Sequence, residues 1–237
     1  MRKFTNLDVS GVYSAIASDP RNAPFPCGCS LAEAVGYLPV ELRNVPEECR
    51  DRFCGLSNLA AWAPWEGQKL ILDVGCGAGL DTILLYRRVG ATIVGVDFSE
   101  AMLSVAQKAS RQAGLSNLKF THSKGTALPF PANTFEAAMF NGLLNMNRHR
   151  KKILEELKRV LRPHSPLWGS EIVLRAQPTA KASFANWVGG VAGAKQSAFL
   201  LSELEAAGFS EVKILRVHRN VRTTTEEIAV ADFVASA

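Results

Sequence analysis

Short apolar runs alternate with amphipathic stretches over residues 67–237 of the chain. A short apolar run bounded by turn residues is typical of a buried strand, whereas apolar residues three and four apart are typical of a helix. Strands are expected at residues 69–74, 92–96, 118–122, 135–140, 167–174, 212–217 and 228–234. Helices are expected at residues 82–88, between 99 and 114, and at 149–161 and 202–207. This alternation predicts an α/β fold, a doubly wound seven-stranded mixed sheet that closes with an antiparallel hairpin.

The first 66 residues differ in composition from the rest of the chain, because they hold four of the five cysteines and many prolines. Short helices are expected there at residues 31–36 and 45–52. We interpret residues 1–66 as an N-terminal cap that packs over the ligand site of a core at residues 67–237. The core carries an insertion at about residues 177–197.

The first strand of the core is followed at once by a turn that is dense in glycine. Asp73 precedes Gly75, Gly77 and Gly79, which gives the pattern D-x-G-x-G-x-G. Glycine lets the backbone turn sharply and lets a ligand approach it closely, and the helix that follows presents unpaired N–H groups. Leu80 stands where a dinucleotide-binding G-x-G-x-x-G motif requires a small residue. The spacing therefore favours a nucleoside ligand over a dinucleotide.

The second strand ends at Asp97, where an acidic residue in a doubly wound fold holds ribose hydroxyls. Together the turn and this acid resemble motif I of the class I S-adenosylmethionine (SAM) methyltransferases. The resemblance implies a Rossmann-like fold and SAM as the cofactor. It implies these cofactor-binding residues: Asp73, Gly75, Cys76, Gly77, Gly79, Asp97, Phe98, Met102, Gly125, Thr126 and Asn141. The alternative is a plain strand-to-helix turn, in which Cys76 is a small filler.

The cap carries a linked set of short motifs. Residues 27–39 read CGCSLAEAVGYLP, residues 45–47 read VPE, and residues 54–58 read CGLSN. This set resembles the segment before the core in the arsenite methyltransferases, where thiolates hold trivalent arsenic beside the methyl group of SAM. Thiolate is the form of cysteine that binds a soft, thiophilic element. The resemblance implies these substrate thiols: Cys27, Cys29 and Cys54.

The core departs from that family at three positions. Gly142, after Asn141, and Trp187 in the insertion stand where the family carries cysteines. Lys124 stands where class I enzymes often carry an aspartate that binds the adenine amino group. Two thiolates can hold a monomethyl arsenical, whereas arsenite itself requires three. The scaffold thus indicates an arsenite-methyltransferase relative with a changed substrate, and the alternative is that the cap cysteines are small packing residues.

The chemistry expected of this site is direct in-line methyl transfer, in which positioning of the reactants contributes most. A soft nucleophile needs no general base, whereas an oxygen or nitrogen nucleophile does. Asn141, at the end of the fourth strand, is a candidate catalytic residue, and Tyr13 and Trp187 are candidate pocket walls. His122 is the best placed histidine. The alternatives are an O-, N- or C-methyltransferase of an organic small molecule and a SAM-binding protein without catalysis.

Charge and composition narrow the expected partners. The net charge of +5 permits attraction to nucleic acid. However, the basic residues between 148 and 162 alternate with apolar residues at helical spacing, without interleaved aromatic residues. That pattern indicates a solvated helix face rather than a base-stacking surface. We therefore expect a small-molecule substrate and no nucleic-acid partner, and the oligomeric state stays open.

The sequence contains no run of about eighteen apolar residues, and residues 1–8 lead into no apolar block. It therefore predicts no membrane partner, no signal peptide and a cytoplasmic location. The spacing of Cys27 and Cys29 is not the C-x-x-C of a zinc ribbon, and no second pair follows at ribbon distance. We therefore expect no metal site.

Overall fold

The apolar runs between residues 70 and 174 form five parallel strands, and two C-terminal strands extend the sheet in antiparallel orientation. The computed structural model describes residues 6–175, 188–223 and 226–237. The sheet order is β3-β2-β1-β4-β5-β8-β7, and β6 pairs with β5 outside this path. The strands are β1 Leu70–Val74, β2 Thr92–Asp97, β3 Leu118–His122, β4 Ala137–Asn141, β5 Pro166–Leu174, β6 Lys195–Gln196, β7 Ser210–Arg219 and β8 Ile228–Ser236.

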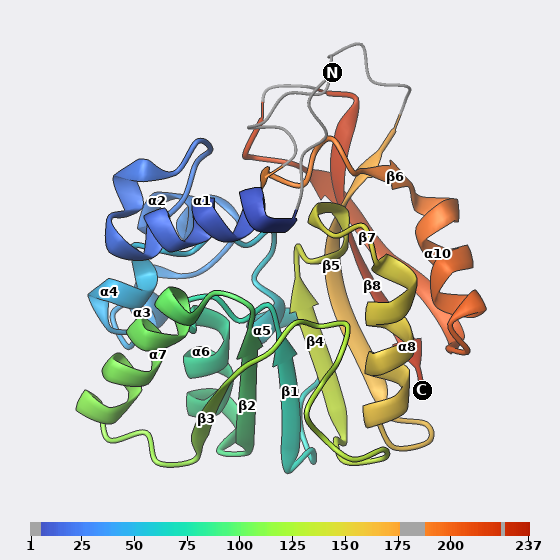
Figure 1. The fold of residues 1–237 in the computed structure, drawn as a ribbon, viewed down its shortest axis with the longest axis horizontal. Helices are drawn as coiled ribbons and strands as arrows, with labels where there is room; N and C mark the ends of the chain where they lie inside the picture. Colours follow the sequence, from blue (N-terminus) through green and yellow to red (C-terminus); the bar gives the residue numbers. More distant parts are fainter. Residues whose placement is uncertain (1–5, 176–187, 224–225) are drawn as a thin grey trace.

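Helices cover both faces of this sheet, and Figure 1 shows α1 to α4 grouped together in blue, away from α8 and α10. In the cap, the helices are α1 Asn6–Ser18, η1 Pro20–Asn22, α2 Cys29–Ala34, α3 Pro39–Leu42, α4 Glu47–Arg50 and α5 Leu59–Trp62. The later helices are α6 Leu80–Val89, α7 Glu100–Gln112, η2 Leu144–Met146, α8 Arg150–Val160 and α10 Ser197–Ala206. No helix within the described ranges has both the length and the apolar character needed to span a bilayer.

Two large apolar clusters lie on the two faces of the sheet. One joins α8 and α10 to strands β4, β5 and β8, with Ile153, Leu157 and Leu204 fully buried. The other joins the cap to α6, α7 and β1, and its members include Tyr37 and Trp65. Because the cap supplies about half of this second cluster, it packs as a continuation of the core. The cap is thereby fixed relative to the strand ends.

β1 lies between β2 and β4, so the direction of winding reverses on its two sides. Asp73 is in register with Gly95 of β2 and with Met139 of β4. In doubly wound sheets, ligands bind outside the carboxyl ends of the strands at such a reversal. The turn after β1 and the residues that end β2 and β4 therefore meet at one edge of the sheet.

The seven-stranded mixed sheet predicted from the sequence is confirmed, and β6 is a short addition to it. β6 lies in the predicted insertion, of which residues 177–187, with Trp187, fall outside the described residues. The last helix is longer than predicted and begins at Ser197, because Leu200 packs into the core one turn before Leu204. α1 was not predicted, since its apolar residues do not keep to one face.

A buried carboxylate ties the last two strands to the cap. Asp232 on β8 accepts hydrogen bonds from Ser170 at 2.5 Å, from Ser57 at 3.2 Å and from Arg216. His218 Nε2 lies 3.2 Å from the same carboxylate. Burial alone would raise the pKa of Asp232, but the hydrogen bonds outweigh it and hold that pKa below its usual value. Since Ser57 belongs to the segment before α5, the network joins the cap to β5, β7 and β8.

We predict that Asp232→Ala lowers the free energy of unfolding by about 2–4 kcal/mol, because buried hydroxyls and a guanidinium lose their charged acceptor. Urea denaturation followed by circular dichroism measures this loss. Glu205→Ala, an exposed acid on α10, is the control and should stay within about 0.5 kcal/mol of the parent protein. Equal losses in the two variants would contradict the role of Asp232.

Candidate functional site

The turn after β1 is held in a conformation that requires glycine. Gly75, Gly77 and Gly79 have φ angles of 80°, 53° and 86°, in the left-handed region that costs other residues steric energy. The backbone N–H groups of Gly75 and Cys76 donate to the carbonyl of Val96 at 2.7 and 3.1 Å. The turn is thereby fastened to β2 and leads directly into α6.

Asp97 ends β2 beside this turn and is buried. Its two carboxylate oxygens accept hydrogen bonds from the N–H groups of Gly77 at 2.9 Å and Ser99 at 2.8 Å. Burial raises the pKa of Asp97, and the two N–H groups offset that rise only in part. The carboxylate is therefore fixed in place, with lone pairs left over for a ligand.

Asp73 lies at the end of β1 and accepts a 2.6 Å hydrogen bond from the Thr82 hydroxyl in the first turn of α6. Burial, followed by repulsion from the nearby Asp81, raises the pKa of Asp73 well above its usual value. Asp73 therefore anchors α6 to β1.

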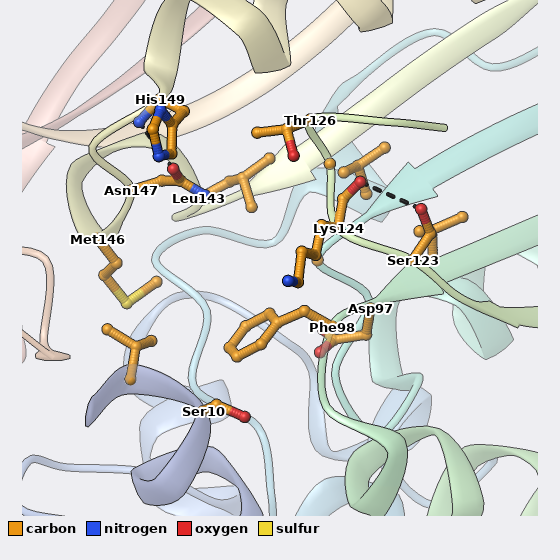
Figure 2. A pocket seen from close by; sticks show the side chains of 15 residues that line it. Ser10, Asp97, Phe98, Ser123, Lys124, Thr126, Leu143, Met146, Asn147 and His149 are labelled. Carbon is orange, nitrogen blue, oxygen red and sulfur yellow. Dashed lines mark hydrogen bonds between the residues drawn. The ribbon is translucent and has the colours of Figure 1, made fainter. Parts of the chain in front are cut away.

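A cavity of about 380 Å³ opens beside Asp97. Figure 2 shows Lys124 extending toward Phe98 from the loop after β3, with Met146 and His149 on another wall. The predicted cofactor residues in its lining are Gly75, Asp97, Phe98, Gly125 and Thr126. Its walls are thus mainly apolar, with one buried carboxylate and a lysine at the edge.

A second cavity of about 70 Å³ continues from the first, because both are lined by Gly75, Asp97, Phe98, Leu143 and Met146. It runs along the glycine turn and beneath the cap. The other predicted residues that line it are Asp73, Cys76, Gly77, Met102, Asn141, Cys54 and Tyr13. The two cavities together therefore collect nearly all of the predicted cofactor residues; Gly79 instead packs against Ala106 and Phe120.

Asn141 lines the second cavity, and its amide is engaged by the protein itself. Its oxygen accepts from the Leu56 N–H at 2.8 Å, and its nitrogen donates to the Ser57 carbonyl at 2.8 Å and to Asp81 at 2.9 Å. The Tyr37 hydroxyl donates to the other oxygen of Asp81. Burial raises the pKa of Asp81 to about 6, although the hydrogen bonds from Tyr37 and Asn141 oppose that rise. Asn141 thus joins the cap, β4 and α6.

Of the three predicted substrate thiols, the structure brings two together. The Cys27 thiol lies 3.3 Å from the carbonyl of Pro20, and the Cys54 thiol lies 3.5 Å from the carbonyl of Arg52. The neighbouring Cys54 thiol and then the charge of Arg222 lower the pKa of Cys27, whereas the Cys27 thiol and burial raise the pKa of Cys54. Of these two thiols, Cys27 therefore ionises first. Cys29 instead packs against the apolar cluster beneath the cap, and burial raises the pKa of Cys49 to about 12.

Several residues of the site were not predicted or are placed away from it. Leu143, Met146 and His149 follow β4 at the sheet edge, a position that could have revealed them. His122 lines neither cavity, and its Nε2 lies 3.0 Å from the carbonyl of Phe98. Across the described residues, no group of three or more His, Cys, Asp or Glu is arranged to hold a metal ion.

Comparison with known proteins finds that this chain is similar to methyltransferases. A methyltransferase domain model matches residues 71–164. An arsenite methyltransferase of Halobacterium salinarum is 28% identical over 212 residues, which cover 88% of this chain and 52% of that protein. A demethylmenaquinone methyltransferase of Clavibacter sepedonicus is 31% identical over 202 residues, which cover 73% of this chain and 80% of that protein. The chain therefore spans about half the length of the first relative and most of the second.

Two solved structures share the fold. An arsenic(III) S-adenosylmethionine methyltransferase from Chlamydomonas reinhardtii has a TM-score of 0.66 and 22% identity, over 83% of this chain and 71% of that one. Phosphoethanolamine N-methyltransferase 2 of Haemonchus contortus, in complex with S-adenosyl-L-methionine, has a TM-score of 0.63 and 15% identity, over 76% of this chain and 51% of that one.

We predict that Asn141→Ala loosens the cap, because three buried hydrogen-bonding groups of the cap and α6 lose their partner. Limited trypsin digestion should cleave after Arg52 at least about tenfold faster than in the parent protein, in keeping with a loss of 1.4 kcal/mol or more in local stability. Asn117→Ala, in an exposed loop, is the control. Equal cleavage rates in the two variants would show that the amide does not hold the cap.

Proposed function

This chain belongs to the S-adenosyl-L-methionine-dependent methyltransferases, and we propose that it methylates a small thiophilic acceptor, a trivalent arsenical, held by Cys27 and Cys54. The observation that carries this proposal is the pairing of the two thiols, of which Cys54 lines the cavity along the glycine turn. A thiolate pair binds a soft element better than any oxygen or nitrogen ligand.

The cofactor residues fit a nucleoside donor. Asp97 offers a fixed carboxylate to ribose hydroxyls. The larger cavity, where the adenine ring would lie, is lined by Phe98, Gly125 and Thr126. The glycine turn exposes its backbone to the smaller cavity. When bound, SAM supplies an activated methyl group on a sulfonium. The role of the protein is then to bring donor and acceptor into line, and such positioning contributes up to about 7–11 kcal/mol.

The number of thiols in the pair determines which trivalent arsenical it suits best. Two thiolates leave trivalent arsenic with one further substituent, so a monomethyl arsenical satisfies all three valences without a hydroxyl, whereas arsenite held by the pair keeps one. The lone pair of the metalloid is the nucleophile, and no proton has to be removed. This agrees with a second cavity that no histidine lines.

An organic acceptor is the second candidate, and the walls of the larger cavity favour it. Val9, Leu143 and Met146 present an apolar surface there, and His149 is a base within the same lining. The relative named demethylmenaquinone methyltransferase supports this class. A SAM-binding protein without catalysis is the remaining alternative.

Transfer of labelled methyl from SAM distinguishes these candidates. We predict transfer to monomethylarsonous acid, weaker transfer to arsenite, and none to a panel of phenols, amines and thiols. Cys27→Ser and Cys54→Ser should each lower the rate at least about tenfold, because one thiolate cannot hold the metalloid in line. Cys29→Ser tests how many thiols hold the metalloid. A two-thiol site predicts little loss of rate in this variant, and an equal loss in all three variants would contradict it.

Transfer to a phenol that survives both serine variants would establish the organic acceptor. Binding of SAM without transfer to any acceptor would establish a protein without catalysis.

We also predict that Asp97→Asn weakens binding of S-adenosylhomocysteine at least about tenfold, because a hydrogen bond to a charged acceptor contributes about 1.5–3 kcal/mol. Isothermal titration calorimetry measures this change. Glu100→Gln, an exposed acid three residues further along, is the matched control. Unchanged affinity in Asp97→Asn would contradict the ribose assignment.

A further inference from the structure

Arg222 reaches the cap beside Cys54 from the loop between β7 and β8, far from the cap in sequence. Its backbone N–H donates to the side-chain oxygen of Asn220 at 3.0 Å, and Asn220 is itself buried. This contact fixes the start of the loop. The Arg222 side chain is thereby directed toward the cap instead of outward from the end of the hairpin.

The guanidinium of Arg222 is held beside the thiol pair by two contacts. Its Nη1 donates to the backbone carbonyl of Cys54 at 3.1 Å. The guanidinium carbon lies 4.3 Å from the centre of the Phe25 ring, which is cation–π distance. Its Nη2 is buried and has no hydrogen-bond partner among the described residues. The side chain is therefore held in place beside Cys54 and Phe25.

No carboxylate within the described part of the chain forms an ion pair with Arg222. A partly buried cation without a counter-charge is costly. The ionisable groups that act on Cys27 besides Arg222 are Cys54, Asp51 and Arg52, and Asp97 acts on Cys54. Tyr13 also faces this cluster, but burial raises its pKa and keeps it neutral. A thiolate in the pair is the anion that Arg222 lacks.

We propose that Arg222 is a positioning residue that stabilises the Cys27 thiolate beside Cys54 and keeps the pair ready for a thiophilic ligand. The proposal rests on the proposed function in taking this pair as the acceptor site. In the structure the Cys54 Sγ lies 3.5 Å from the carbonyl of Arg52, and the Cys27 Sγ lies 3.3 Å from the carbonyl of Pro20. Cys27 ionises before Cys54, which keeps its proton. A positive charge beside the pair favours that ionised form, as for other reactive cysteines.

The test follows the rate at which iodoacetamide alkylates Cys27 as a function of pH, since only the thiolate displaces iodide. Mass spectrometry with fragment ions separates Cys27 from Cys29, which lies on the same tryptic peptide. In the parent protein, the pH at which Cys27 is alkylated at half its maximal rate should lie below the pH at which free cysteine titrates. In Arg222→Met the midpoint should move up by about one pH unit, which is about tenfold less thiolate at neutral pH.

Two further variants separate charge from packing. Arg222→Lys keeps the charge and should shift the midpoint by less than half as much as Arg222→Met. Arg219→Met removes an exposed charge at the end of β7 and should leave the midpoint unchanged. Circular dichroism confirms that each variant is folded.

The proposal is overturned if Cys27 of the parent protein titrates at or above free cysteine, a measurement that needs no variant. It is also overturned if Arg222→Met and Arg222→Lys shift the midpoint equally. Methyl transfer is not part of this readout. A normal thiol midpoint in an active methyltransferase would therefore refute only the role of Arg222, whereas a lowered midpoint without transfer to arsenicals would refute only the acceptor assignment.

Discussion

One side-chain amide fastens the cap to the carboxyl edge of the sheet, and the geometry of the site depends on it. Asn141 uses both of its polar atoms to hold the backbone at Leu56 and Ser57 and the carboxyl of Asp81. A Cβ on Gly55 would lie 2.6 Å from its nitrogen, so only glycine permits this approach. Because Cys54 directly precedes that glycine, the amide also sets how far one thiol lies from the glycine turn.

One partner of this amide is the buried acid Asp81, whose ionisation is disfavoured by folding. Folding raises the pKa of Asp81 from 3.8 to about 6, so the folded chain binds its proton more tightly than the unfolded chain. The contribution of Asp81 to stability is therefore largest below the unfolded pKa and falls as pH rises between these two values. Above that window the ionised carboxylate still accepts hydrogen bonds from Tyr37 and Asn141, which limit the loss.

The sequence was sufficient for features that are local along the chain. The glycine turn, Asp97 and the strand pattern are each contained within a few residues, and the sheet they predict is the one observed. Contacts between residues that lie far apart in the sequence could not be predicted from it. Cys54 and Arg222 are separated by 168 positions, and no periodicity or motif links them. The role of Asn141 in holding the cap was likewise hidden, because its partners lie in the cap and in α6. Its position at a strand end indicated only a catalytic or cofactor-binding residue.

The number of thiols within reach then narrows the chemistry of the acceptor. Cys29 packs into an apolar cluster, and Cys76 is buried within the glycine turn, where burial raises its pKa well above the usual value. Cys49 lines the smaller cavity, but with a pKa of about 12 it remains a thiol at neutral pH. Only Cys27 and Cys54 are left to act together. In the proposed function, a two-thiolate site satisfies two of the three valences of a trivalent metalloid and leaves the third for one further substituent, a methyl group or a hydroxyl.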